Sequence, residues 1–179
     1  MHLRTARIWL VASLAALSFI ACSSDGSLPR AFEDPPSQSD PDCPTNRGDE
    51  RTIAELSNDA RRKRERRPFG LDPQLSRVAR KHTSEMIAAG DLVHSNPTEL
   101  KRRVTNWIEL NENIGKGGDA EGIFRTFMNS DAHRRRILNQ RYDHVGVGVL
   151  EDAAGSMWVT MVFESSKDPG TRLPRPTCY

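Results

Sequence analysis

Hydrophobic residues recur at helical spacing in two long segments of the chain, residues 50–66 and 73–90. In the first segment the opposite face is charged, which is the pattern of a helix that packs on a core. Pro73 suits the first turn of the second helix, and Gly90 suits its C-terminal cap. We therefore expect two long helices. Shorter helical pieces are expected near residues 97–107, at 119–129 and just after Ser130, with an irregular stretch over 108–118.

The pattern changes from helical spacing to alternation in the last third of the chain. Val145, Val147 and Val149 alternate with glycines, and residues 157–163 are apolar on both faces. A short run that is apolar on both faces is typical of a buried strand, and residues 151–156 provide the turn between the two strands. Helices that precede strands indicate an α+β domain, and no repeat of about 20–50 residues points to a solenoid.

The first 21 residues have the pattern of an export signal. Basic residues precede an apolar run, residues 8–21, which is shorter than the roughly 18 residues of a membrane-spanning helix. The run ends in a sequence that resembles a bacterial lipobox, Phe19-Ile20-Ala21-Cys22, with Phe19 where leucine is usual. The resemblance implies a lipoprotein signal peptide over residues 1–21 and lipidation of Cys22. The alternative is a signal peptide that is cut nearby and releases a free secreted protein.

Residues 22–48 are rich in Ser, Pro, Asp and Gly and contain few apolar residues. We expect a disordered tether in this segment, because such a composition cannot bury a core. The folded domain is expected at 49–166 and a C-terminal tail at 167–179.

The chain has three cysteines, and if Cys22 carries lipid, then Cys43 and Cys178 remain. An export signal implies an oxidising compartment, which favours a disulfide between the remaining two cysteines over two free thiols.

Composition and charge exclude some classes of partner. The 179 residues are 36% hydrophobic and 28% charged, which suits one domain of ordinary size. The 26 basic residues exceed the 24 acidic ones by two, and that excess comes from Arg4 and Arg7 in the signal. The rest of the chain is neutral, which argues against nucleic acid as a partner.

His94, Glu112 and His133 are the candidates for chemistry. Two imidazoles and one carboxylate could bind a zinc-like ion and leave an open position, as catalytic zinc sites do. Their spacings of 18 and 21 residues match no local metal motif, and no HExxH sequence is present. On spacing alone, two loop histidines and a paired glutamate are the better explanation.

Short motifs between about Asn58 and Phe163 occur in a specific order. The strongest are Glu112-Asn113-Ile114-Gly115 and the segment from Met128 through His133 to Leu138, and weaker ones are Gly70-Leu71-Asp72-Pro73, His94-Ser95 and Val145-Gly146-Val147-Gly148-Val149. In this order and spacing they resemble the bacterial CAP domain, also called the SCP-like domain. Its relatives include cysteine-rich secretory proteins, insect antigen 5 and plant pathogenesis-related proteins.

The resemblance implies a three-layer α-β-α sandwich with a central antiparallel sheet. It also implies a cleft that contains His94, Glu112 and His133, with Ser130 near the place of a second glutamate of the family. Family members bind zinc or other divalent ions at the histidines, so His94 and His133 are the expected ligands of a metal that is not obligatory. Glu112 is the candidate catalytic residue, although no reaction is established across the family.

Several neighbours of the cleft are also assigned. Arg136 replaces the asparagine usual in bacterial members, and Asn111 replaces the glycine usual before Glu112. We expect Asn113 to bond to the cleft backbone and Arg134 to pair with a carboxylate near the cleft.

Two further histidines lie outside this set. We expect His82 to be packed and hydrogen-bonded on the apolar face of its helix, and His144 to lie at the surface.

Three functions remain open. The first is an exported, lipid-anchored and non-enzymatic binding module on the extracytoplasmic face of a membrane, whose cleft takes a divalent metal, a small apolar ligand, or a lipid or envelope component. The second is a metal-dependent hydrolase that uses His94 and His133 as ligands and Glu112 as general base. The third is a structural protein of the cell envelope.

Overall fold

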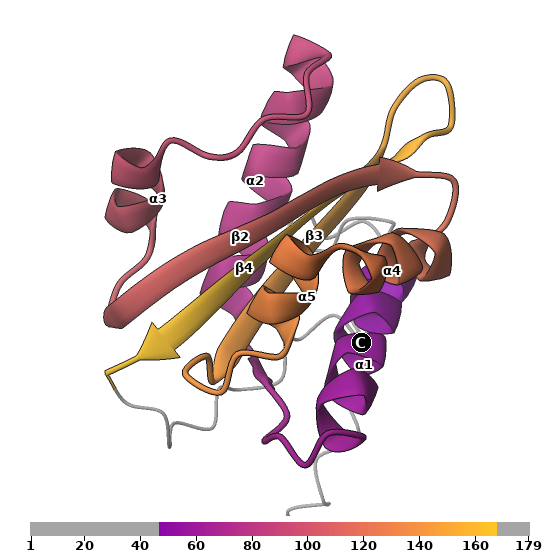
Figure 1. Cartoon of the computed structure of the whole chain (residues 1–179). Helices are drawn as coiled ribbons and strands as arrows, with labels where there is room; N and C mark the ends of the chain where they lie inside the picture. Colours follow the sequence, from indigo (N-terminus) through magenta and orange to yellow (C-terminus); the bar gives the residue numbers. More distant parts are fainter. Residues whose placement is uncertain (1–46, 168–179) are drawn as a thin grey trace, which may run out of the picture. The chain divides into compact units, whose positions relative to one another are not determined.

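Five helices and four strands make up residues 47–167, the part of the chain that the computed structural model describes (Figure 1). In chain order they are α1 (Arg47–Arg62), β1 (Gly70–Leu71), α2 (Pro73–Ala89), α3 (Pro97–Arg103), β2 (Trp107–Gly117), α4 (Ala120–Asn129), α5 (Asp131–Ile137), β3 (His144–Glu151) and β4 (Met157–Ser166). The first helix begins at Arg47, two residues inside the segment assigned to the tether. The expected signal peptide, most of the expected tether, the expected tail from residue 168 on and the three cysteines lie outside the described residues.

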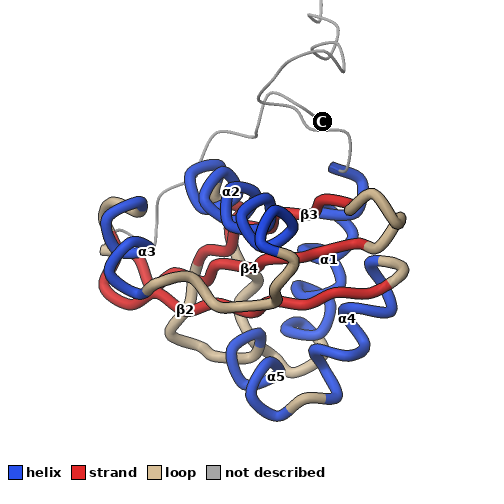
Figure 2. The backbone as a smooth tube through the Cα atoms, turned by 90° about the horizontal axis from the view of Figure 1, so that it is seen from above, coloured by secondary structure: helices blue, strands red, loops and turns tan. Residues whose placement is uncertain are grey.

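The four strands form one sheet in the order β1-β3-β4-β2. Helices α2 and α3 cover one face of this sheet, and α1, α4 and α5 cover the other (Figure 2). This is the expected α-β-α sandwich. The sheet is antiparallel except at one edge, where the two residues of β1 pair in parallel with His144 and Val145.

The sequence predicted an irregular stretch over residues 108–118. Strand β2 lies there instead, and the prediction was therefore wrong. It pairs with β4 along its length, from Trp107 opposite Ser166 to Gly117 opposite Met157, with one irregularity near its start. Its middle reads Leu-Asn-Glu-Asn-Ile, and asparagine and glutamate are poor strand formers. The long partner strand overrides these weak preferences.

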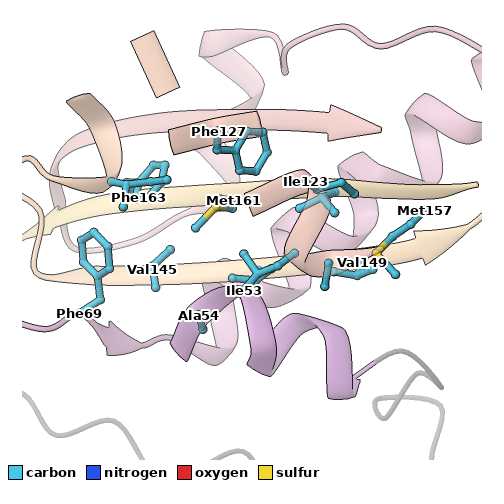
Figure 3. Packing of buried hydrophobic residues seen from close by; sticks show 14 of the residues in the cluster. Ile53, Ala54, Phe69, Ile123, Phe127, Val145, Val149, Met157, Met161 and Phe163 are labelled. Atoms are coloured by element: carbon cyan, nitrogen blue, oxygen red, sulfur yellow. The ribbon is translucent and has the colours of Figure 1, made fainter. Parts of the chain in front are cut away.

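Buried side chains lie on both faces of the sheet. Between the sheet and α1 and α4, residues such as Ile53, Phe127 and Met161 form the larger cluster (Figure 3). The other face packs Leu75 of α2 and Leu100 of α3 against β4.

Glycines set the distance between α2 and the sheet. A Cβ atom on Gly146 would lie 2.2 Å from the backbone carbon of Leu75, and one on Gly148 would lie 2.3 Å from the backbone nitrogen of Arg80. Any larger residue would push the helix away, because interiors are close-packed. The alternation of valine and glycine therefore allows α2 to lie directly on the backbone of β3.

Arg61 ties the end of α1 to the end of α5. Its guanidinium is 1% exposed and donates to the carbonyl oxygens of Ile137 (2.8 Å), Asn139 (2.8 Å) and Tyr142 (3.0 Å). It also lies 3.7 Å from the ring centre of Phe69. Arg61 begins a basic run over residues 61–67, and such a run at a helix end is ordinarily solvated, whereas Arg61 itself is buried.

His144 is also buried, contrary to expectation. It begins β3 with 4% of its surface exposed, and its ring lies over Gly70, where a Cβ atom would come within 2.7 Å of Cδ2. The parallel pairing with β1 covers this position, and the sequence pattern gave no sign of so short a strand.

Candidate binding cleft

Glu112 lies in the middle of β2 and is 5% exposed. Its Oε1 accepts a hydrogen bond from His94 Nδ1 at 2.8 Å and one from the backbone nitrogen of Ser95 at 3.0 Å. Its Oε2 accepts from the Ser95 hydroxyl at 2.6 Å. Three donors from two consecutive residues therefore fix the loop after α2 against the strand.

His82 supports the same loop from α2. Its Nε2 donates to the carbonyl oxygen of Val93 at 2.8 Å and lies 3.9 Å from Oε1 of Glu112. A carbonyl only accepts, so this contact assigns the proton to Nε2. The expectation of a packed, hydrogen-bonded His82 is confirmed. Its support of the His94 loop was missed, because nothing in the spacing links residue 82 to residue 93.

His133 lies on α5. Its backbone oxygen accepts from Asn113 Nδ2 at 3.2 Å, which confirms the backbone role expected of Asn113. Its ring centre lies 5.0 Å from that of Phe127. Burial lowers the pKa of His133, and the charges of Arg136 and His94 lower it further, so the ring is neutral at neutral pH. Its Nδ1 is buried and has no hydrogen-bond partner among residues 47–167.

The two residues that depart from the family pattern contact each other. Arg136 Nε donates to Asn111 Oδ1 at 2.6 Å, and Nη1 lies 3.4 Å from Asn113 Oδ1. Asn111 Oδ1 also accepts from the backbone nitrogen of Glu112 at 3.0 Å. Asn111 and Asn113 of β2 thus orient Arg136 of α5 beside Glu112 and the loop that carries His94.

Arg136 and Asn111 line two clefts that meet at the edge of β2. The first cleft, of about 190 Å³, is bounded by His94, Ser95, Leu100 and Leu110 among others, and we call it the His94 cleft. The second, of about 240 Å³, lies on the α5 side and includes Arg135, Glu109 and Tyr142.

Ser130 and Arg134 take positions away from these clefts. Ser130 is the N-cap residue of α5, and its side chain makes no capping hydrogen bond. Arg134 pairs with the carboxylate of Asp131, which lines neither cleft, and donates to the carbonyl oxygen of Met128 at 2.8 Å. Neither side chain lines either cleft.

The donors do not form a conventional metal site. Within residues 47–167, no group of three or more His, Cys, Asp or Glu side chains gathers closely enough to hold an ion. Nδ1 of His94 is already bonded to Glu112, and Glu112 is used by the loop. Two imidazoles fall short of the three protein ligands of a catalytic zinc site.

The comparisons with known proteins agree with this architecture. Residues 54–163 match the family described as CAP, the cysteine-rich secretory protein family. The chain belongs to the CAP family. A curated relative of this CAP domain is the uncharacterised protein YkwD of Bacillus subtilis (strain 168), which is 34% identical over 116 residues. The alignment covers 61% of this chain but only 44% of that protein.

Solved structures share the CAP fold. An outer surface protein from Borrelia burgdorferi matches 68% of this chain and 96% of its own, with a TM-score of 0.64 at 16% identity. An extracellular protein containing an SCP domain from Bacillus anthracis matches 66% of this chain and 40% of its own, with a TM-score of 0.59 at 26% identity. In the described part of this CAP domain, no helix has both the length and the apolar character needed to cross a bilayer.

Proposed function

We propose that this CAP domain is displayed on the extracytoplasmic face of a membrane through lipid on Cys22, and that it acts there as a binding module and not as an enzyme. Two observations support the location. The first 21 residues have the pattern of an export signal that ends at a lipobox-like cysteine. Two relatives with the same fold are described as an outer surface protein and an extracellular protein.

The hydrogen bonding of Glu112 carries the binding-module part of the proposal. A carboxylate has about four acceptor positions, and three of them already receive hydrogen bonds from His94 and Ser95. The one position that remains belongs to a carboxylate that is only 5% exposed, whereas a general base needs a free position that faces its substrate. Glu112 instead shapes the wall of a preformed cleft.

The lining of the His94 cleft supports an organic ligand. Pro97, Leu100 and Leu110 contribute apolar surface to the lining, and His94 and Arg136 contribute polar groups. Ligand sites commonly combine a largely apolar wall with a few placed polar groups. A lipid or envelope component fits this lining, and a divalent ion on His94 and His133 is the weaker candidate.

One experiment tests the anchor. The full chain is expressed in a bacterium with lipoprotein processing, and the intact mass of the membrane fraction is measured. We expect a mature chain that begins at a lipid-modified Cys22, with Cys22→Ala failing to acquire lipid and Ser23→Ala behaving as the parent. A mature chain recovered from the medium that begins elsewhere would refute the anchor.

A second experiment tests the cleft. The natively purified protein is inventoried for metals and small molecules, alongside His94→Ala and the exposed control Arg102→Ala. We expect a bound component that His94→Ala loses and Arg102→Ala retains. An envelope phenotype that survives His94→Ala, in a protein that carries no ligand, would favour the purely structural role.

A further inference from the structure

Arg136 is a charged group of the cleft that the proposed function leaves unexplained. Its neighbour Arg134 pairs with Asp131, and Arg103 of α3 pairs with Glu85. Arg136 forms no ion pair with any carboxylate of residues 47–167, and its recorded contacts are the two amide oxygens of Asn111 and Asn113.

Two carboxylates line the same clefts as Arg136, but neither forms an ion pair with it. Glu112 shares the His94 cleft, but its oxygens are held by His94 and Ser95. Glu109 shares the second cleft, where its Oε1 accepts from the Tyr142 hydroxyl at 2.9 Å and its Oε2 lies 3.9 Å from Arg141. Neither carboxylate contacts the guanidinium of Arg136, so no anion within residues 47–167 takes up its remaining donors.

Some N–H groups of the Arg136 guanidinium also have no hydrogen-bond partner in the described domain. Arginine has five N–H groups in a fixed planar fork. The Nε hydrogen goes to Asn111, and one Nη1 hydrogen points to Asn113. The other Nη1 hydrogen and both Nη2 hydrogens have no recorded partner in the described domain. A planar pair of such donors matches the oxygens of a carboxylate or a phosphate.

The asparagines make this fork a prepared site. A free arginine side chain loses conformational entropy when it binds an anion, and that loss weakens binding. Here the partly buried guanidinium already donates two hydrogen bonds, to Asn111 and Asn113 of β2, which hold it at the cleft wall. Leu100 and Leu110 lie in the same cleft and offer an apolar surface for the rest of a ligand.

We propose that Arg136 makes the His94 cleft a site for a small organic oxyanion, whose carboxylate or phosphate pairs with the guanidinium and whose apolar part rests on Leu100 and Leu110. The inference rests on the proposed binding function and specifies the class of ligand. A cleft of about 190 Å³ is smaller than ordinary ligand pockets, which measure roughly 300–1,000 Å³, so the bound portion is small.

The test compares matched probes by calorimetry on the full chain. Benzoate carries a carboxylate, phenyl phosphate carries a phosphate, and benzamide has the shape of benzoate without the charge. We expect an oxyanion probe to bind at least about tenfold more tightly than benzamide, and the ratio of benzoate to phenyl phosphate affinity identifies the headgroup. Equal affinity for benzoate, phenyl phosphate and benzamide would overturn the proposal.

Two variants locate the site. Arg136→Gln removes the fork, and Arg135→Gln removes the same charge from a residue that lines only the second cleft. We expect Arg136→Gln to weaken oxyanion binding at least about tenfold and Arg135→Gln to change it less than about twofold. Equal losses of oxyanion affinity in both variants would show that the positive charge acts without a specific contact. That result would refute the site at Arg136.

The result separates this inference from the proposed function. If the natively purified protein carries an uncharged ligand that His94→Ala loses, while Arg136→Gln retains it, the oxyanion site is wrong and the binding module stands. If the native protein carries nothing and none of the three probes binds, both proposals fail.

Discussion

Arg136 Nε donates a hydrogen bond of 2.6 Å to Oδ1 of Asn111, which joins α5 to the edge strand of the sheet. The same two positions carry other residues in the bacterial family pattern. An arginine at position 136 needs an acceptor within reach, and glycine at position 111 would supply none. Asn111 and Arg136, the two residues that differ from the family pattern, therefore form one interacting unit.

A double-mutant cycle tests this unit. Asn111→Ala and Arg136→Gln each remove one partner, so the combined variant should lose less stability than the sum of the two losses. We expect a coupling of about 1 kcal/mol in the free energy of unfolding, measured by urea denaturation. Strictly additive losses would show that the contact contributes nothing to stability.

Glu112→Gln should loosen the loop that carries His94. A glutamine keeps one oxygen for His94 and the Ser95 backbone, and its amide nitrogen can donate to the Ser95 hydroxyl, so three charge-assisted hydrogen bonds become weaker neutral ones. We expect stability to fall by about 1–3 kcal/mol and amide hydrogen exchange to rise over residues 91–96. Glu99→Gln, at a half-exposed side chain, is the control and should leave both measurements unchanged.

Glu164 should make stability fall as pH rises. It is 3% exposed, and burial together with the charges of Asp72 and Asp143 raises its pKa from about 4.5 to about 7. The folded state then holds more protons than the unfolded state between these values, so the free energy of unfolding decreases as pH rises through this window. Glu164→Gln should remove the decrease, gaining up to about 3 kcal/mol on the parent between pH 5 and 8.

Urea denaturation at pH 5 and pH 8 measures this gain. The exposed control Glu121→Gln should follow the parent at both values. A Glu164→Gln variant with the same pH profile as the parent would show that this carboxyl is ionised in the fold at all pH values tested.

Zinc should bind weakly and should bind less well in acid. Within residues 47–167 no third His, Cys, Asp or Glu joins the imidazoles of His94 and His133, and Arg136 adds positive charge beside His133. Imidazoles must be neutral to bind the ion, so protons should displace it between about pH 7 and 5. Calorimetric titration at pH 7.5 and 5.5 would measure the difference. Binding that is unchanged in a His94→Ala, His133→Ala double variant would place the ion elsewhere.

The sequence predicts the parts of the fold that have strong local signals. Pro73 and Gly90 bracket α2 as expected, since Asp72 caps its start and Gly90 adopts the left-handed conformation at its end. The strands β3 and β4 also lie where the valines and the two-sided apolar run placed them. These elements combine a hydrophobic period with a specific end signal, so local residues suffice to predict them.

The rest depends on contacts between distant residues. Strand β2 has weak propensity and forms by pairing with β4, and His144 is buried by a strand of two residues. Each of the cleft contacts of Glu112 and Arg136 joins residues 17 to 25 positions apart. The family resemblance named His94, Glu112 and His133, but no pattern in a single sequence reveals which side chains hold them.

Arg61 limits how far the domain can be shortened. All the residues that line the two clefts lie after residue 93, so a chain that begins at α2 would keep every one of them. Such a chain would lack Arg61. The carbonyl oxygens of Ile137, Asn139 and Tyr142, where the polypeptide leaves α5 for β3, would then lose the hydrogen bonds that the guanidinium of Arg61 donates. The smallest unit able to present the cleft therefore includes a helix that never touches it.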